Sequence, residues 1–277
     1  MIKWINQGQE YVPGYQEFCT VIFNLPAAET FIKEEIMSLQ RLDKILSGQN
    51  IATRSETKNM VKKGLITVNG QTVKRSNEKF DPDTDEFIVN GIKIVYKKHL
   101  YIMMNKPSGV LSASRDGRTK TVIDLLPEHL RRDGLFPAGR LDKDTEGFIL
   151  ITDDGELAHK MLSPKSHVYK LYLAECDREL NKNDVKAFSE GIQMGDLQFM
   201  PAEMKIIADK TALVEICEGK FHQVKKMFHA VGTEVVKLKR LRIGEVNLDQ
   251  SLKQGECREL TEKEINDILS RKHGINV

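Results

Sequence analysis

The chain has 277 residues, of which 40% are hydrophobic and 30% are charged, and its formal net charge at pH 7 is +2. It has no apolar run near the roughly 20 residues that cross a bilayer, and its N-terminus lacks the charged-then-apolar order of a secretory signal. Its four cysteines, Cys19, Cys176, Cys217 and Cys257, form no C-x-x-C pair, which disfavours a disulfide framework or zinc knuckle. We therefore expect a cytoplasmic globular protein with reduced thiols, no membrane association and about two domains.

The first 36 residues contain two Lys against five Glu, a net charge of −3, and show no clear order of helices or strands. A helical pattern starts only after Met37, and residues 33–35 (KEE) are what a purine-rich ribosome-binding site would give if translated. We therefore hypothesise that the native protein starts at Met37 and that residues 1–36 are an extension created by a misassigned start. A genuine extension is the alternative. The intact mass of the protein made from its own gene tests this, and a species beginning at Met1 would contradict it.

Residues 37–98 form the second segment, and their pattern predicts a small α+β module. A first helix is expected over residues 38–47, and a second helix over residues 53–64, where it opens with a capping box. Asn69 and Gly70 tolerate the positive φ angles of a tight turn, so the apolar runs on either side of them predict a β-hairpin.

The positive charge of the chain is concentrated in this segment, which has 12 Lys and Arg against 7 Asp and Glu, a net charge of +5. Six of these cations fall on the second helix and the hairpin: Arg54, Lys58, Lys62, Lys63, Lys74 and Arg75. Basic residues on such a face are often only solvated, but here they dominate the charge of the whole chain. We therefore favour contact with the phosphates of a nucleic acid.

The same segment resembles the S4 RNA-binding domain in the order and spacing of three motifs. These are residues 41–44 (RLDK), Arg54 with Ser55 at the start of the second helix, and residues 64–70 (GLITVNG). Thr53 is a mild departure, since members of that family usually have a serine or a small residue near this position. The resemblance implies an RNA-binding face formed by six residues: Arg41, Lys44, Arg54, Ser55, Lys58 and Lys62.

Residues 99–277 form the third segment, in which predicted strands outnumber predicted helices. Strands are expected over residues 100–105, 148–152, 168–174, 202–207, 212–217 and 234–239. Helices are expected over residues 156–162, 184–190, 222–231 and 262–270. The many short connections predict a mainly antiparallel sheet flanked by helices, so the fold class of the chain is α+β.

A loop bounded by glycines, residues 139–147 (GRLDKDTEG), precedes one of these strands. It offers Asp142, two residues after Arg140, as a single carboxylate that can stand ionised at the mouth of a pocket. An ordinary loop aspartate is the simplest alternative. The spacing also imitates an EF-hand calcium loop, but Asp153 replaces the usual bidentate Glu, residues 136–139 cannot form an entering helix, and no second such loop is present.

The helix predicted at residues 222–231 has apolar residues on one face and basic residues on the other. A lysine there is normally only solubilising, but if Lys225 faces Asp142 it would keep that carboxylate ionised. Tyr172 lies in a predicted strand and would give a nucleobase a flat stacking surface if it faced a pocket rather than the core. Because the chain has no P-loop, no dinucleotide-binding glycine fingerprint and no metal-ligand spacing of His and Cys, we expect neither a cofactor nor a metal.

Residues 37–270 resemble the RsuA/RluB family of pseudouridine synthases. Five motifs in family order carry this resemblance: residues 105–110 (NKPSGV), 139–142 (GRLD), 170–172 (KLY), 218–227 (EGKFHQVKKM) and 238–244 (LKRLRIG). The resemblance implies a pseudouridine synthase catalytic domain at residues 99–277. Such a domain cuts the N1 glycosidic bond of a uridine, turns the base and rejoins it through C5, without a cofactor.

The resemblance also implies roles for four residues. Asp142 is the catalytic carboxylate, and Lys225 is its basic partner. Tyr172 stacks on the base and helps at C5, and Arg140 holds the displaced nucleotide. Whether Asp142 attacks the sugar, attacks the base or assists formation of a glycal stays open.

The S4-like segment disfavours the subfamily that lacks such a domain. Residues 201–203, 222–225 and 255–261 look most similar to the enzyme of the small ribosomal subunit. Its large-subunit relatives commonly have Asn-Arg-Gln-Ile-Arg-Arg where this chain has residues 221–226. We therefore expect a monomeric enzyme that modifies 16S ribosomal RNA within a small-subunit assembly particle. One alternative is a 23S ribosomal RNA pseudouridine synthase. The other is an S4-type assembly factor that binds RNA without catalysing a reaction, and the presence of Asp142, Tyr172 and Lys225 together disfavours it.

Overall fold

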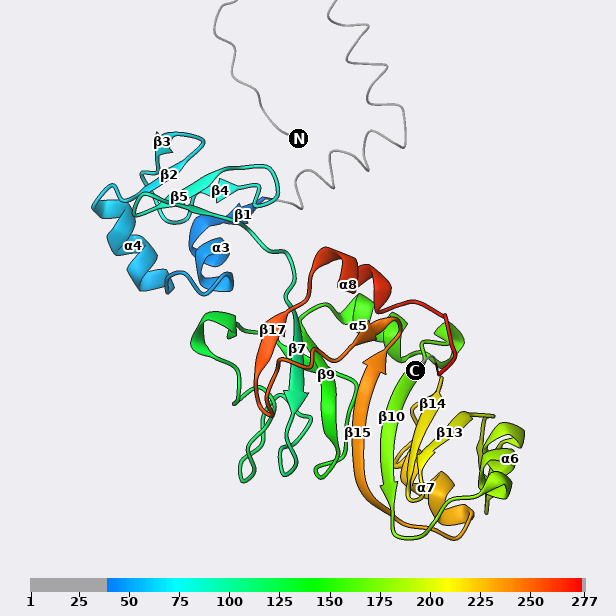
Figure 1. Ribbon diagram of the computed structural model, residues 1–277. Helices are drawn as coiled ribbons and strands as arrows, with labels where there is room; N and C mark the ends of the chain where they lie inside the picture. Colours follow the sequence, from blue (N-terminus) through cyan, green and yellow to red (C-terminus); the bar gives the residue numbers. More distant parts are fainter. Residues whose placement is uncertain (1–38, 276–277) are drawn as a thin grey trace, which may run out of the picture. The chain divides into compact units, whose positions relative to one another are not determined.

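The computed structural model describes residues 39–275 (Figure 1). The predicted extension at residues 1–36 and the predicted start at Met37 lie outside these residues. The chain divides into two compact units between Tyr96 and Lys97, which are described separately below.

The first unit has two short helices and two small sheets. Its elements are β1 (Gln40–Arg41), α3 (Leu42–Gly48), α4 (Arg54–Lys62), β2 (Ile66–Val68), β3 (Gln71–Thr72), β4 (Lys79–Phe80), β5 (Phe87–Val89) and β6 (Ile92–Ile94). Four strands form an antiparallel sheet in the order β3-β2-β5-β6, and β1 pairs with β4. The core between the helices and the sheet is apolar and includes Leu42, Leu46, Ile66 and Phe87.

The two helices and the hairpin predicted for this unit are present, with one correction. The first helix begins at Leu42 rather than Ser38, because Gln40 and Arg41 pair as a strand with β4. The second helix has the predicted capping box, since the Thr53 side chain accepts from the Glu56 N–H and the Glu56 carboxylate accepts from the Thr53 N–H. Thr53 therefore performs the capping that a serine would perform at this position.

The second unit is built on one large mixed sheet. Its path is β13 (Glu203–Ala208), β14 (Thr211–Ile216), β10 (Lys170–Cys176), β15 (Val235–Ile243), β9 (Glu146–Thr152), β7 (Tyr101–Lys106) and β17 (Cys257–Glu259). Beside this path, β8 (Phe136–Ala138) pairs with β9 and β16 (Val246–Asn247) pairs with β15. A separate hairpin joins β11 (Ile192–Met194) and β12 (Leu197–Phe199). Among the described residues, β9 and β15 are the one parallel strand pair, so the mainly antiparallel sheet is confirmed.

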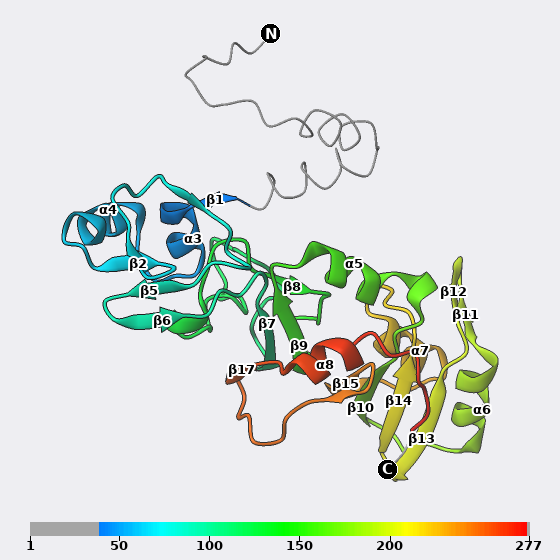
Figure 2. The ribbon, with the colours of Figure 1, turned by 90° about the horizontal axis from the view of Figure 1, so that it is seen from above.

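Helices cover both faces of this sheet, as expected. The apolar stripes of α6 (Lys182–Glu190) and α7 (Gln223–Ala230) pack in one core, where the rings of Phe188 and Phe228 lie 4.9 Å apart. The helices α5 (Gly155–Leu162) and α8 (Glu262–Asp267) pack against the opposite face, around Phe148. Figure 2 shows α6 beside β13, the strand at the end of the sheet.

Gly147 lies where the parallel strands β9 and β15 come into contact. It opposes Arg240 across the β9–β15 pair, and its φ angle is +99°. A Cβ atom on Gly147 would stand 2.2 Å from the Arg240 carbonyl oxygen, so only glycine fits here. The close approach brings the loop that ends at Gly147 against the middle of β15.

Candidate active site

The loop between β8 and β9 carries Asp142, and main-chain contacts hold it in place. The Ser112 hydroxyl accepts from the Leu141 N–H at 3.0 Å and donates to the Leu141 carbonyl at 2.8 Å. The Thr145 N–H donates to the Asp142 carbonyl at 3.1 Å. These contacts fix the backbone on both sides of Asp142 and leave its carboxylate half-buried and facing a pocket.

Lys106, at the end of β7, lies under the same loop with none of its surface exposed. Its ammonium lies within hydrogen-bond distance of four carbonyl oxygens, those of Pro107, Asp142 and Lys143 at 3.1 Å each and that of Thr145 at 2.7 Å. Burial lowers the pKa of Lys106 to about 8. The Lys106 ammonium thus holds the backbone of the Asp142 loop through its carbonyl oxygens.

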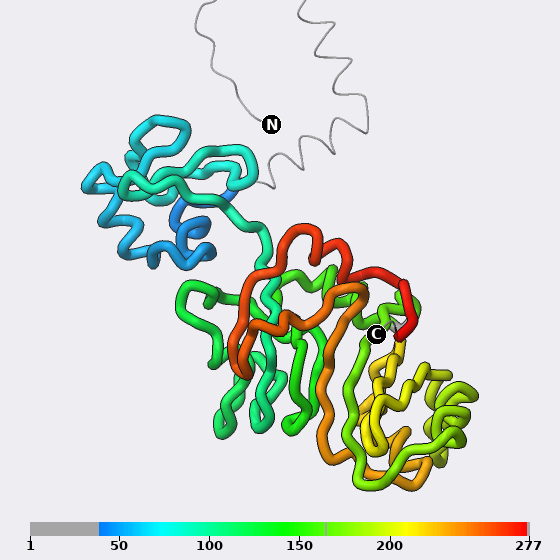
Figure 3. Tube along the Cα trace, viewed as in Figure 1, coloured from blue at the N-terminus to red at the C-terminus, as the bar shows by residue number. Residues whose placement is uncertain are grey.

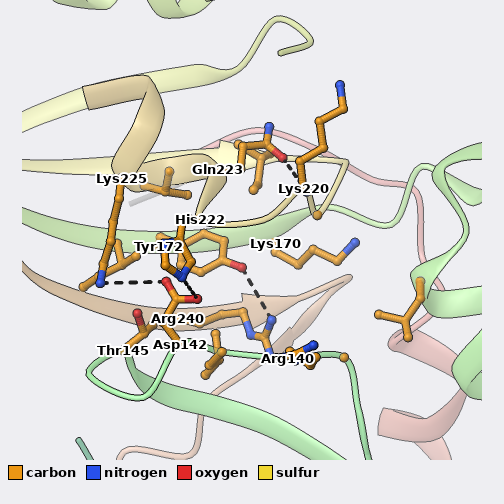
Figure 4. Close-up of a pocket in the computed structure, with 17 residues that line it drawn as sticks. Arg140, Asp142, Thr145, Lys170, Tyr172, Lys220, His222, Gln223, Lys225 and Arg240 are labelled. Atoms are coloured by element: carbon orange, nitrogen blue, oxygen red, sulfur yellow. Dashed lines mark hydrogen bonds and ion pairs between the residues drawn. The ribbon is translucent and has the colours of Figure 1, made fainter. Parts of the chain in front are cut away.

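A cavity of about 330 Å³ opens between this loop, the strands β10 and β15, and the start of α7 (Figure 4). It is lined by all four residues that the sequence assigns to catalysis or to holding the nucleotide: Arg140, Asp142, Tyr172 and Lys225. The structure therefore brings together side chains that lie up to 85 positions apart in the chain.

Asp142 has two basic side chains beside it, those of Lys225 and His222. Lys225 Nζ stands 3.8 Å from Asp142 Oδ2, whereas it donates to both carboxylate oxygens of Asp144 at 2.7 Å. Lys225 therefore lies within ion-pair distance of both carboxylates and closer to Asp144, and its hydrogen bonds hold the pKa of Asp144 below its usual range. The basic side chain nearest to Asp142 is that of His222, whose Nε2 lies 3.3 Å from Asp142 Oδ1.

His222 takes this position because it ends the turn before α7 in a left-handed conformation, with φ at +52°. Its ring stacks on that of Phe221, with centroids 3.8 Å apart and planes 21° apart. Phe221 is 69% exposed and lines a groove that adjoins the cavity on the other side of Asp142. The sequence pattern predicted only that His222 lies on the polar face of a helix. It did not reveal the left-handed turn before α7 that directs His222 toward Asp142.

Tyr172 lies on β10 with its hydroxyl directed toward Arg240 of β15 (Figure 4). The two residues oppose each other across the β10–β15 pair, and Arg240 Nη1 lies 3.4 Å from the Tyr172 hydroxyl oxygen. Arg240 Nε also donates to the Phe148 carbonyl at 2.7 Å. Lys170, two residues before Tyr172, lines the same cavity. The sequence did not single out Lys170 or Arg240, although both fall within the motifs at residues 170–172 and 238–244.

Arg140 is exposed and lines both the cavity and the adjoining groove. The groove also contains Ser112, Asp116, Lys143 and Phe221. A side chain at the junction of two depressions can contact a nucleotide that enters the cavity and the strand on either side of it.

In the first unit, a separate groove collects most of the predicted RNA-binding face. It is lined by Arg41, Arg54, Ser55, Lys58 and Lys62, together with Lys74 and Arg75 from the segment after β3. Lys44 and Lys63 are exposed but do not line this groove. Arg41 is also bonded to Asp43, with Nε 3.0 Å from Oδ1, so part of its charge is already neutralised.

The calcium alternative fails on the structure of the loop. The segment before it is strand β8, not the helix that an EF-hand requires, and three of its carbonyls already bind the Lys106 ammonium. Within residues 39–275, the one group with metal-ligand spacing is Glu203, Glu215 and His273, at the far end of the sheet.

The two carboxylates of this cluster have partners nearby in the chain's fold. Glu215 forms an ion pair with Arg242 and accepts from the Gly274 N–H at 2.7 Å. The Ile275 N–H donates to Glu203 at 3.3 Å. The cluster thus anchors the C-terminal segment, drawn in red in Figure 3, to β13 and β14. In the same described range, no helix is long and apolar enough to span a bilayer.

The fold and the cavity define a pseudouridine synthase with an S4 domain, and comparison with known proteins agrees. The RNA pseudouridylate synthase family matches residues 100–230, and the S4 domain family matches residues 40–85. A crystal structure of a pseudouridylate synthase superposes with a TM-score of 0.58 at 35% identity, covering 83% of this chain and 99% of that one.

Three relatives cover most of the chain. An uncharacterized RNA pseudouridine synthase of Bacillus subtilis is 47% identical over 81% of this chain and 96% of its own length. The ribosomal small subunit pseudouridine synthase A of Vibrio cholerae is 39% identical over 82% and 99%. The ribosomal large subunit pseudouridine synthase B of Bacillus subtilis is 34% identical over 86% and 99%. The chain therefore belongs to the RsuA/RluB family of pseudouridine synthases and is an isomerase.

Proposed function

We propose that this chain converts one uridine of 16S ribosomal RNA, of the position 516 type, to pseudouridine. The enzyme acts as a cytoplasmic monomer, without a cofactor, on an assembling small subunit. The single observation that carries the proposal is the cavity that gathers Asp142, Tyr172, Lys225 and Arg140. Similarity to a small-subunit synthase at 39% identity, against 34% for a large-subunit synthase, favours the 16S substrate.

The reaction is an isomerisation, in which the N1–C1′ bond breaks, a C5–C1′ bond forms, C5 loses a proton and N1 gains one. Asp142 acts on the breaking bond, and Tyr172 packs against the base while it turns. Because Tyr172 is buried, a base can reach it only after leaving the RNA stack, which costs a few kcal/mol. Arg140, at the junction of cavity and groove, holds the nucleotide displaced in this way.

The groove beside the cavity offers a contact for unpaired RNA. Phe221 and His222 line this groove, and Lys226 Nζ lies 4.9 Å from the centre of the Phe221 ring. This is the stretch in which the chain departs from the Asn-Arg-Gln-Ile-Arg-Arg sequence of large-subunit relatives. An exposed aromatic ring beside a cation suits an unpaired base of single-stranded RNA.

Purified protein tests the proposal on unmodified 16S and 23S transcripts, with carbodiimide and reverse transcription used to map pseudouridine. A single new stop in the 16S transcript is the expected result. A stop in the 23S transcript alone would keep the chemistry and overturn the substrate. Absence of any stop on either transcript, or on assembly particles lacking the modification, would support an RNA-binding assembly factor instead.

The S4 groove makes a prediction about salt dependence. Replacing Lys58 and Lys62 with Gln removes two exposed charges from the groove, so the slope of log K against log salt should become shallower by about 0.7 to 0.9 per lost phosphate contact. Filter binding of a 16S fragment at several salt concentrations measures the slope. Lys93→Gln is the control, because Lys93 lies on β6, pairs with Glu86 and does not line the groove. A slope unchanged by the double substitution would mean that these lysines are only solvated.

A further inference from the structure

Lys170 is a buried lysine whose charge is not compensated. It is the first residue of β10, is 5% exposed, and lines the same cavity as Tyr172 two residues later. Alternation along the strand sends Lys170 and Tyr172 to the cavity face, while Leu171 between them packs with Leu213 on the opposite face. Within residues 39–275, the structure shows no hydrogen bond and no ion pair for the Lys170 ammonium.

Two carboxylates on the neighbouring strand β14 and in the turn after it are already bound to other groups. Glu215 pairs with Arg242 on the opposite face of the sheet, and Glu218 pairs with Lys220 and accepts from the Gln223 side chain. The charged neighbour that faces Lys170 is instead a second cation, Arg240 of β15. Burial first, and then Arg240, lower the pKa of Lys170 to about 8.

Arg240 is itself 4% exposed, and its Nη2 is buried without a partner. Its Nη1 makes only the long contact of 3.4 Å with the Tyr172 hydroxyl. The cavity wall therefore presents two buried cations around a phenol, with unused donors on both. A buried charge without a counter-charge is costly, so this arrangement fits an anionic group that arrives with the substrate.

The other buried lysine of the site shows how this fold compensates such a charge when the role is structural. Lys106 is fully buried, and its ammonium is surrounded by four carbonyl oxygens. Lys170 has no such surroundings. In Figure 4 its side chain extends along the cavity away from Asp142, with Tyr172 between them.

We propose that Lys170, together with Arg240, binds an anionic oxygen of the uracil ring at the end of the cavity away from Asp142. The inference rests on the pseudouridine synthase activity and names two further residues that act in it. When the N1–C1′ bond breaks and its electron pair stays with the base, the ring carries a negative charge shared by N1 and its carbonyl oxygens. Donors fixed where this charge develops stabilise the transition state more than the bound substrate.

A phosphate oxygen of the displaced nucleotide offers the same chemistry from another source. The phosphate is charged before and after the reaction, whereas the uracil oxygen becomes charged only as the bond breaks. Loss of a phosphate contact therefore weakens RNA binding, while loss of a contact with the uracil anion lowers the rate at saturating enzyme.

Single-turnover kinetics of the full chain on unmodified ribosomal RNA test the inference. We expect Lys170→Met to lower the rate at saturating enzyme by about 100-fold or more, with RNA affinity within about twofold of the wild type. Its melting temperature should be unchanged or higher, because an uncompensated buried charge is removed. The matched control is Lys205→Met, since Lys205 is exposed on β13 and lines neither the cavity nor the grooves.

The other outcomes separate the possibilities. Weaker binding with an unchanged rate would assign Lys170 to a phosphate and overturn its contact with the base. A lower melting temperature with an unchanged rate would make Lys170 structural and overturn the inference. An inactive wild type on both ribosomal RNAs would contradict the proposed function itself, and with it any role of Lys170 in that reaction.

The pH profile gives an independent readout of Lys170. The groups that face it are Arg240 of β15, Cys217 after β14 and Tyr172 on its own strand, and burial raises the pKa of the Cys217 thiol. With the pKa of Lys170 lowered to about 8, its ammonium loses a proton as the pH rises through that value, so kcat/KM should fall about tenfold by pH 9. Lys170→Arg keeps its charge and should remain active to higher pH. An identical fall in both proteins would exclude Lys170 as the titrating group.

Discussion

Replacing Asp142 with Asn should lower the rate of pseudouridine formation by at least about 100-fold while leaving the fold and the RNA affinity nearly intact. The carboxylate is the one acidic group that lines the cavity with Tyr172. The loop itself is held by main-chain contacts with Lys106, Ser112 and Thr145, none of which uses the Asp142 side chain. The Asn side chain has the same shape as Asp, so the substitution removes the negative charge while the main-chain contacts that hold the loop remain.

Single-turnover assays, thermal melting and filter binding together measure these three properties. The control is Asp209→Asn, which removes an exposed carboxylate from the turn between β13 and β14. That variant should match the wild type in all three assays. Residual turnover above a few percent in purified Asp142→Asn would remove Asp142 from its catalytic role.

Gly147→Ala should destabilise the second unit by more than about 4 kcal/mol, which is exceptional for one methyl group. The new Cβ would stand 2.2 Å from the Arg240 carbonyl oxygen and 2.8 Å from the Arg240 nitrogen, both of which are backbone atoms. Neither can move without separating β9 from β15, the parallel pair that brings the Asp142 loop against Arg240. Denaturant titration of the purified variant measures the loss.

Two other glycines separate the causes of this effect. Gly109 has a φ of +87° but open space around it, so Gly109→Ala carries the backbone strain alone and should cost about 1 to 2 kcal/mol. Gly155, in the first turn of α5, has neither constraint, and Gly155→Ala should be close to neutral. If Gly147→Ala cost no more than Gly109→Ala, the close contact with β15 would be disproved.

Much of the fold was predictable because its local patterns agree with the tertiary structure. The apolar stripe of α7 and the alternation along β10 predicted the right elements and the right faces. The loop at residues 139–147 was identified by its glycines, and Asp142, Tyr172, Lys225 and Arg140 do meet in one cavity. The roles of these four residues remain predictions until they are substituted.

The remaining features depend on pairings that no local pattern reveals. The β17 strand pairs with β7 about 150 positions earlier in the chain, and β9 meets β15 in parallel only because Gly147 permits it. Within a strand, Lys170 and Arg240 have the sequence appearance of solvated residues, and their burial follows from the neighbouring strands. Lys225 lies closer to Asp144 than to Asp142 because of the backbone course of the loop between them, which no sequence pattern specifies.

Mapping of pseudouridine in both ribosomal RNAs, from cells with and without this gene, tests the central claim most directly. The deletion strain should be complemented with the wild-type gene and with the Asp142→Asn gene. We expect one 16S stop to disappear on deletion, to return with the wild-type gene and to stay absent with Asp142→Asn. A 16S pattern unchanged by deletion would contradict the account.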